Sequence, residues 1–304
     1  MRQQVENMLT IVPFAESHIA PFTAWFNALP GNDVWTADWV RSKTLDDPNY
    51  DPALMLAAQD GDEPVGFLLG NIVNETGWIK AFLVRPDRQR RGIGTLLFQA
   101  AERTLAQRNI ETVTAGYAPL YYFIPGVNLK YTSAAVFLDQ RGYQTDRTTR
   151  VNLDVLIQDR DFNTAASEAR LRERGIVVRR GTLTDASALA ELCSVNGYQG
   201  WMVESRIALE NTPSTVFVAE RNGDILAFAA HSVVGPVHFG PMLTSPDMRG
   251  MRIGSVLLKR CLTDWQRAGH DRCEIVWAGP IAFYARVVGA TLGNAFWIFH
   301  KSLV

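Results

Sequence analysis

The sequence predicts a mixed α/β protein built from two consecutive domains. Its length of 304 residues fits two domains of ordinary size. Residues 82–95 and residues 242–255 align without a gap at a constant offset of 160 positions, as Pro86 with Pro246 illustrates. Each copy lies between a strand pattern and an amphipathic helix pattern. A repeat of this period indicates a duplicated domain, because solenoid units are much shorter.

The first half predicts strands and helices in a mixed order. Ser17 is an N-cap candidate for the first helix, and the turn at 31–33 ends that helix. Leu97, Ala101 and Leu105 recur on one face of a second helix. In chain order we expect a strand at 9–14, a helix at 17–29, strands at 53–59, 66–71 and 78–84, a helix at 94–108, a strand at 111–115, a helix at 133–140 and a strand near 150–153.

The second half repeats this order. The turn Asn222-Gly223-Asp224 predicts a hairpin, and Leu257, Cys261 and Trp265 share one helix face. We expect a strand at 176–180, a helix from 184 or 185 to 194, strands at 215–220, 225–233 and 238–243, a helix at 254–268, a strand at 273–277, a helix at 282–288 and a strand at 295–301. The predicted domains are therefore 1–155 and 175–304, joined by a charged, partly helical linker at 156–174.

Composition narrows the function class. The apolar fraction of 47% indicates domains with substantial cores. The formal net charge of −1 argues against non-specific nucleic-acid binding and against a membrane-surface role. The three cysteines form no C-x-x-C pair, and the N-terminus shows no signal-peptide pattern, so we expect a cytoplasmic protein.

The repeated loop predicts a phosphate-binding cradle. Glycines before a helix let the backbone approach a ligand closely. The free N–H groups of the first helical turn, with the positive end of the helix dipole, favour an anion. Arg88, Arg90 and Arg91 add positive charge beside the first copy. The alternative interpretation is an ordinary strand-to-helix turn with solvated arginines.

The segment Gln89-x-x-Gly92-x-Gly94 resembles the signature of the GNAT superfamily of acyl-CoA N-acyltransferases. The order of elements in both halves is similar to that fold. The resemblance implies two consecutive GNAT-like domains, each a mostly antiparallel mixed sheet with splayed central strands flanked by helices. It also implies acetyl-CoA as the co-substrate and no metal.

The resemblance places the coenzyme on both loops and on the strands before them. The residues expected to contact it are Phe82, Leu83, Val84, Gln89, Arg90, Arg91, Gly92, Ile93, Gly94 and Thr95 in the first copy, and Met242, Leu243, Arg249, Gly250, Met251, Arg252, Gly254 and Ser255 in the second.

The two halves depart from the family pattern in different ways. Tyr284 stands where the family commonly has a tyrosine that returns a proton to the departing thiolate, whereas the first half has Leu138 there. Arg252 replaces the first signature glycine of the second loop. Its side chain either crowds the diphosphate or bends away and adds a cation. Tyr284 acts either as the catalytic acid or as a packed aromatic.

Candidates for the remaining roles are less specific. His231, His238 and Glu220 are candidate bases near the second cleft, with structural roles as the alternative. The segment 196–201 lies where the family places acceptor-binding loops, and is read as either a mobile lid or a surface loop. Four tyrosines before the first domain's last helix line a pocket or simply pack; they are Tyr117, Tyr121, Tyr122 and Tyr131.

These observations lead to one main hypothesis and two alternatives. The main one is an acetyl-CoA-dependent N-acetyltransferase in which a primary amine attacks the thioester directly. Its acceptor is a small-molecule amine or a peptide N-terminus, and the protein is a monomer or a homodimer. The first alternative is a non-catalytic acyl-CoA-binding sensor or scaffold. A Rossmann-type nucleotide module ranks third, because the loop lacks the G-x-G-x-x-G spacing and follows a domain's fourth strand.

Overall fold

The computed structural model describes residues 9–31 and 35–304, and it divides the chain into two compact units. The first unit comprises Met1–Arg150 together with Asn294–Val304, and the second comprises Val151–Gly293. The units thus differ from the two continuous domains expected, since the C-terminal segment belongs to the first unit and the expected linker belongs to the second. The turn expected at 31–33 lies mostly outside the described residues.

The first unit is built on a six-stranded sheet in the order β1-β2-β3-β4-β5-β14. Neighbouring strands are antiparallel except for β4 and β5, which are parallel. Its strands are β1 (Leu9–Pro13), β2 (Met55–Asp60), β3 (Glu63–Val73), β4 (Thr76–Val84), β5 (Thr112–Ala115) and β14 (Phe299–Ser302). Its helices are α1 (Ile19–Asn27), α2 (Ala37–Lys43), α3 (Ile93–Gln107) and α4 (Thr132–Gln140).

The second unit repeats this order in strands β8-β9-β10-β11-β12-β7, which form part of an eight-stranded sheet. The parallel pair is again the fourth and fifth strands, β11 and β12. Its strands are β7 (Arg150–Leu156), β8 (Val177–Arg180), β9 (Val216–Arg221), β10 (Asp224–His231), β11 (His238–Thr244) and β12 (Arg272–Ile275). Its helices are α5 (Ala165–Arg172), α6 (Ala186–Val195), α7 (Gln199–Glu210), α8 (Ile253–Arg267) and α9 (Ile281–Val288).

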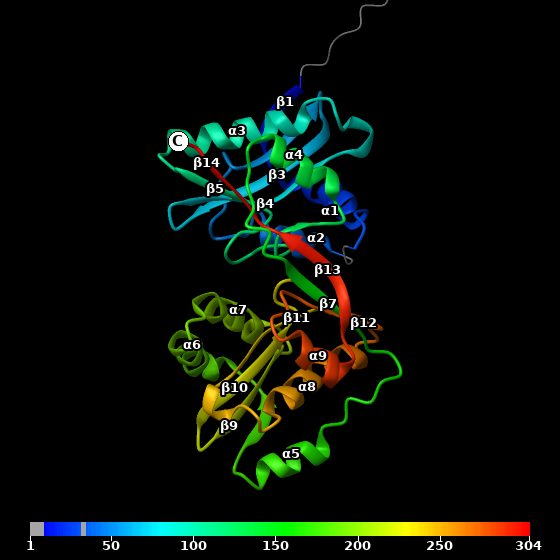
Figure 1. Cartoon of the computed structure of the whole chain (residues 1–304), viewed down its shortest axis with the longest axis vertical. Helices are drawn as coiled ribbons and strands as arrows, with labels where there is room; N and C mark the ends of the chain where they lie inside the picture. Colours follow the sequence, from blue (N-terminus) through cyan, green and yellow to red (C-terminus); the bar gives the residue numbers. More distant parts are fainter. Residues whose placement is uncertain (1–8, 32–34) are drawn as a thin grey trace, which may run out of the picture. The chain divides into compact units, whose positions relative to one another are not determined.

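In each unit the strand beside the fifth strand comes from the other half of the sequence. β14, the red C-terminal strand in Figure 1, pairs with β5 from Phe299 opposite Ala115 to Ser302 opposite Thr112. β7, which follows the first half of the chain, pairs with β12 of the second unit. The expectation that the strand near 150–153 completes the first domain is therefore wrong. The strand expected at 295–301 is divided between β13 (Thr291–Trp297), which lies in the eight-stranded sheet, and β14, which lies in the first sheet. An apolar alternation suits both sheets, so the pattern does not select the partner.

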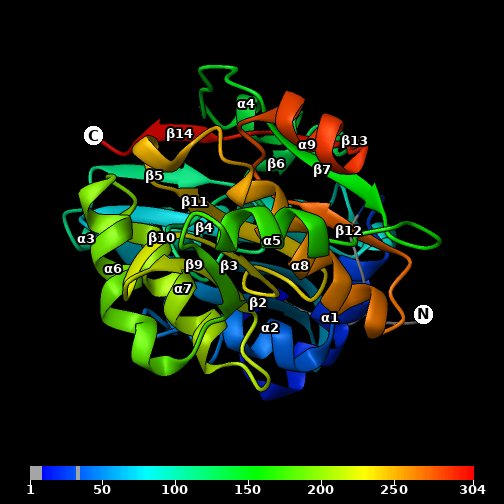
Figure 2. The same ribbon diagram turned by 90° about the horizontal axis from the view of Figure 1, so that it is seen from below.

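Both faces of each sheet are covered by apolar side chains. In the first unit, Leu97, Ala101 and Leu105 of α3 are buried on one face, as the periodicity predicts. An aromatic cluster under α1 and α2, which includes Phe14, Phe22 and Phe67, fills the other face. In the second unit α8 covers one face and the pair α6 and α7 covers the other (Figure 2).

Two helices were not predicted. α2 has only seven residues and begins behind a Thr36 cap. α7 begins at Gln199, inside the segment interpreted as a lid or surface loop, and Tyr198 stacks on Trp201 with ring centroids 4.1 Å apart. Glycines in that segment favoured a loop, but tertiary packing of Ala208 and Leu209 stabilises the helix. Within the described part of the chain, no helix is both long enough and apolar enough to cross a bilayer.

The exchanged strand predicts a specific effect of Phe299→Ala. The ring is buried in the core under α3, so its loss should destabilise the first unit by about 3 kcal/mol. Amide hydrogen exchange should accelerate in α3 and β5 and stay unchanged in α8. Val304→Ala, at an exposed position, is the control. Faster exchange confined to the second unit would contradict the strand assignment.

His18 predicts a pH dependence of stability. Burial lowers the pKa of its imidazole, and its Nδ1 accepts a hydrogen bond from the Ala15 N–H at 3.0 Å, so the folded state favours the neutral form. Below the unfolded pKa of about 6.5 the unfolded chain binds a proton that the folded chain resists. The free energy of unfolding should therefore fall as pH decreases from 7.5 to 5.

Denaturant unfolding across this pH range measures the effect. His18→Gln should flatten the slope of unfolding free energy against pH, while His270→Gln, at an exposed position, should leave it unchanged. Equal slopes in the native chain and in the His18→Gln variant would show that another group is responsible.

Candidate functional site

Both repeated loops have the same backbone path. A short 3-10 turn, Pro86–Arg88 or Pro246–Met248, precedes an extended residue and then the helix. In the first loop the side-chain amide of Gln89 donates to the carbonyl of Val84 at 3.1 Å. In the second, the Arg249 guanidinium donates to the equivalent carbonyl of Thr244 at 3.4 Å. Gln or Arg at this position therefore ties the loop to the end of the preceding strand.

Each loop contains two residues with a left-handed backbone conformation. Glycine occupies the second of these positions in the first loop and the first of them in the second loop. The first loop has Arg90 at φ +63° and Gly92 at φ +83°. The second has Gly250 at φ +83° and Arg252 at φ +65°. Because Arg252 adopts the conformation of Gly92, the missing signature glycine leaves the backbone path intact. The Arg252 side chain is exposed, so of the two alternatives the structure favours the one in which it bends away.

The start of each helix presents N–H groups with no acceptor inside the helix. The first helical bond of α3 runs from Leu96 N–H to Gly92, and that of α8 runs from Val256 N–H to Arg252. The preceding N–H groups of each helix therefore remain available to a ligand. No heavy atom lies within 4 Å of a Cβ built on Gly92 or on Gly250, so the space in front of each loop is open. This arrangement suits a diphosphate.

The charge beside the first loop is partly neutralised. Arg88 pairs with Asp60 at 3.0 Å, whereas Arg90 and Arg91 are exposed. Ile93 is buried and anchors the helix start to the core. The loop thus keeps two guanidinium groups that face solvent.

The fourth and fifth strands splay in both units, as expected. β4 pairs with β5 only from Gly77 to Ile79, although β4 continues to Val84. β11 pairs with β12 only at His238 and Phe239, although β11 continues to Thr244. β4 therefore has no strand partner on its β5 side beyond Ile79. β11 likewise has none on its β12 side beyond Phe239. Phe82, Leu83, Val84, Met242 and Leu243 all lie on these unpaired stretches.

The two units differ in the residue that begins the splay. A bulge places Lys80 there in the first unit, and the Lys80 side chain is buried. Its Nζ forms an ion pair with Asp47 and donates to the Lys43 carbonyl at 2.7 Å. Burial lowers the pKa of Lys80, although the negative charge of Asp47 acts to raise it. The second unit has Gly240 at the equivalent position, with only Val276 within 4 Å of a Cβ built there. The residue that begins the splay therefore carries a buried side chain in the first unit and no side chain in the second.

Sequence reasoning missed Lys80. The signal was present, because a single lysine interrupts the apolar strand pattern from Trp78 to Val84. A buried lysine needs a partner, and Asp47 lies far from it in sequence.

Tyr284 and Leu138 occupy equivalent places. Each follows a phenylalanine that contacts the second glycine of its loop, Phe283 at Gly254 and Phe137 at Gly94. The Tyr284 ring is buried against Phe239, with centroids 6.1 Å apart. Burial raises the pKa of its phenol, so the hydroxyl retains its proton at neutral pH.

The two candidate histidines lie on opposite faces of the second sheet. His231 contacts Trp265 and lies 3.3 Å from the carboxylate of Asp264, both on α8. Glu220 pairs with Arg179 at 2.6 Å, which gives it a structural role.

His238 is placed differently. Its Nε2 lies 3.2 Å from the carboxylate of Glu274, and these two residues form the first of the two register pairs that join β11 to β12 before the strands separate. Both side chains are buried. His238 is therefore the imidazole nearest to the second splay along the strand.

The four tyrosines of the first unit are engaged in packing contacts. Tyr117 packs edge-on against Tyr122 and Trp78. The Tyr131 hydroxyl donates to the Pro30 carbonyl at 2.9 Å. The Tyr121 ring lies under the ammonium of Lys43.

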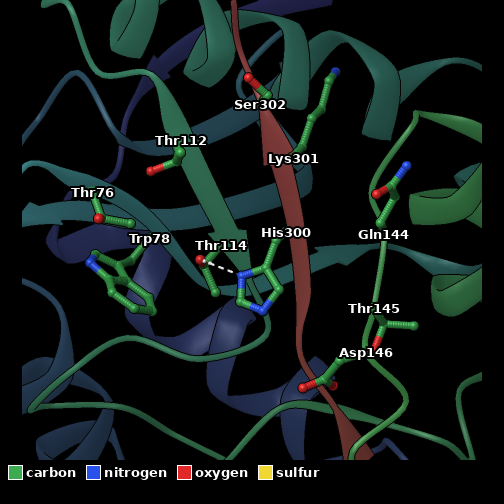
Figure 3. Close-up of a pocket in the computed structure, with 10 residues that line it drawn as sticks. All are labelled: Thr76, Trp78, Thr112, Thr114, Gln144, Thr145, Asp146, His300, Lys301 and Ser302. Carbon is green, nitrogen blue, oxygen red and sulfur yellow. Dashed lines mark hydrogen bonds between the residues drawn. The ribbon is translucent and has the colours of Figure 1, made fainter.

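A polar cavity of about 630 Å³ lies on the first sheet (Figure 3). β4, β5 and β14 bring two cross-strand rows to one face, Trp78 with Thr114 and His300, and Thr76 with Thr112 and Ser302. The Thr114 hydroxyl lies 3.0 Å from Nδ1 of His300. The exchange of β14 creates this cavity, because His300, Lys301 and Ser302 of its lining belong to the C-terminal strand.

No cluster of side chains in the described part of the chain has the composition of a metal site. Around the second splay and its loop, the groups that could act on a ligand are backbone N–H groups, the Arg252 guanidinium, the Tyr284 phenol and the His238–Glu274 pair.

A family model described as the acetyltransferase (GNAT) family matches residues 16–119 and again residues 186–290. A search of curated proteins found no match.

Several solved structures share the fold along almost the whole chain. One is the glucosamine N-acetyltransferase region of a fungal multi-domain β-N-acetylglucosaminidase, with TM-score 0.75 and 19% identity over 98% of this chain; the chain spans only 38% of that protein. Another is a tandem GNAT protein from the clavulanic acid biosynthesis pathway, with TM-score 0.71 and 16% identity, covering 98% of this chain and 99% of that one. A third is a GCN5-related N-acetyltransferase from Sphaerobacter thermophilus, with TM-score 0.68 and 16% identity, covering 97% and 96%.

The left-handed backbone at Arg252 predicts that Arg252→Gly stabilises the chain. A non-glycine residue in this conformation costs about 1–2 kcal/mol, which the larger freedom of glycine in the unfolded chain partly offsets. The free energy of unfolding should rise by about 0.5–1 kcal/mol in a denaturant titration. Arg252→Ala, which removes the charge and keeps the strained backbone, should give no such gain. An equal gain in both variants would assign the effect to charge.

Proposed function

The chain belongs to the acetyltransferase (GNAT) family, and on this premise we propose that it transfers an acetyl group from acetyl-CoA to a primary amine. The acceptor is a small-molecule amine or a peptide N-terminus. We further propose a cytoplasmic protein that acts as a monomer or a homodimer, in keeping with its three buried cysteines.

The observation that carries the proposal is the duplicated cradle above a splayed strand pair. The N–H groups at the starts of α3 and α8 would hold the diphosphate of the coenzyme. The unpaired edges of β4 and β11 would hold its pantetheine arm through backbone hydrogen bonds. These roles are proposed for the loop residues from Gln89 to Thr95 and from Arg249 to Ser255.

We assign the chemical step to the second unit. Gly240 carries no side chain at the start of the splay, whereas Lys80 fills that position in the first unit. Tyr284 supplies a phenol where the first unit has Leu138, which cannot donate a proton. The two differences lie on separate elements, and both favour the second unit.

The proposed step is direct attack of the amine nitrogen on the thioester carbonyl carbon. A C–N bond forms and the C–S bond breaks. Backbone N–H groups of β11 beyond the splay would stabilise the oxyanion. His238, oriented by Glu274, would take the proton from the amine, and Tyr284 would give its proton to the departing sulfur. The raised pKa of Tyr284 keeps that proton on the phenol until the thiolate forms.

The alternative of a non-catalytic acyl-CoA-binding module suits the first unit. Its cradle matches the family signature fully, but a buried, ion-paired Lys80 begins the splay and Leu138 replaces the tyrosine. We propose that the first unit binds the coenzyme without turning it over.

A thiol-release assay tests the function. The protein should release free thiol from acetyl-CoA in the presence of at least one member of a panel of primary amines and peptide N-termini, and calorimetry should show CoA binding. Binding without release across the panel would favour the sensor. Absence of both would refute the proposal.

Tyr284→Phe should lower the turnover number about 10²-fold or more, because it removes the proposed acid, while CoA affinity stays within twofold. Steady-state kinetics and calorimetry measure the two effects. Tyr198→Phe removes a hydroxyl from an exposed tyrosine of the same unit and is the matched control. An unchanged turnover number would exclude Tyr284 from the mechanism.

A further inference from the structure

Three arginines from two separate segments converge beside the second cradle. They line a cavity of about 200 Å³. Arg170 and Arg174 come from α5 and the turn after it, and Arg252 comes from the loop before α8. Gly250 and Met251 of the loop complete the wall opposite α5. The cavity therefore opens directly beside the backbone that would hold the diphosphate.

α5 is held rigidly against α8, so the position of its arginines is defined. The buried carboxylate of Glu168 accepts hydrogen bonds from Arg260 of α8 at 2.7 and 2.9 Å and from Thr164 at 2.6 Å. Leu171 is buried in the core under α8. The backbone that carries the exposed arginines is therefore already positioned, so binding has to order only their side chains.

The three arginines have no anionic partner in the part of the chain that the structure describes. Arg172, on the same helix, pairs with Glu168, and so does Arg260. By contrast, no ion pair joins Arg170, Arg174 or Arg252 to a described carboxylate, and Glu173, the acidic residue next to Arg174, is exposed. Three like charges around one cavity repel one another, and a bound anion would relieve that repulsion.

The arginines of α5 lie outside the two repeated segments of the chain. Residues 165–174 lie outside both segments matched by the family model, which ends its first match at 119 and resumes at 186. The contribution of α5 therefore comes from the segment that joins the two repeats.

We propose that Arg170 and Arg174 bind the 3′-phosphate of the coenzyme held on the second cradle, and so make this cradle selective for CoA over dephospho-CoA. The inference rests on the proposed function. A phosphomonoester carries nearly two negative charges and three acceptor oxygens, which matches two guanidinium groups. In CoA, one ribose separates the 3′-phosphate from the diphosphate. The cavity likewise lies next to the loop that would hold the diphosphate.

Amide hydrogen exchange of residues 249–256 tests the inference, because it reports the second cradle separately from the first. The full-length protein is titrated with CoA, with dephospho-CoA and with inorganic phosphate. CoA should protect this segment at a concentration about tenfold lower than dephospho-CoA. The double variant Arg170→Gln/Arg174→Gln should weaken CoA about tenfold and leave dephospho-CoA within twofold. Arg267→Gln, at the other end of α8, is the control for loss of a positive charge.

The outcomes separate this inference from the proposed function. Equal protection by CoA and dephospho-CoA, or equal weakening of both in the double variant, would overturn the inference while leaving coenzyme binding intact. Protection by inorganic phosphate at the same concentration as CoA would show a free-anion site and would also overturn it. Failure of both nucleotides to protect either 249–256 or 89–96 would refute the proposed function itself.

Discussion

The backbone of the strand-loop-helix unit is the constraint on which the rest of the structure depends. Two left-handed residues turn the chain so that the first N–H groups of the helix face open space, and a side chain from the loop bonds the last carbonyl of the strand. The same path forms with glycine at either left-handed position. It is therefore the backbone path, and not the identity of one glycine, that the two repeats share. This explains how Arg252 replaces a signature glycine without loss of the cradle.

The exchange of the last strands changes how the chain divides. β7 pairs with β12 in the second unit and β14 pairs with β5 in the first, so each unit contains a strand from the other half of the sequence. A cut at the expected linker would separate β14 from β5 and β7 from β12, and would expose the edges of β5 and β12. The exchange also has a chemical consequence, because β14 brings His300 and Ser302 beside Thr114 and Thr112 and creates the polar cavity of the first unit.

The duplicated units have diverged where the coenzyme arm would enter. The first unit has a buried Lys80 at the start of its splay and Leu138 at the family's tyrosine position, whereas the second unit has Gly240 and Tyr284 at these places. α5 adds arginines to the second cradle only through the joining segment. These three differences are independent in sequence and all distinguish the second unit as the proposed catalytic one.

The sequence by itself determined the features that depend on local spacing. These are the repeated cradle, the buried faces of α3 and α8, and the equivalence of Leu138 with Tyr284. Helix periodicity and loop chemistry act within about ten residues, so a single sequence contains them. The tertiary structure alone decided which sheet each last strand joins, because an apolar alternation fits either sheet. It also decided that His231 faces α8 while His238 lies at the splay. A bulge of unpredictable position sets the register there, and only long-range pairing brings Lys80 to Asp47.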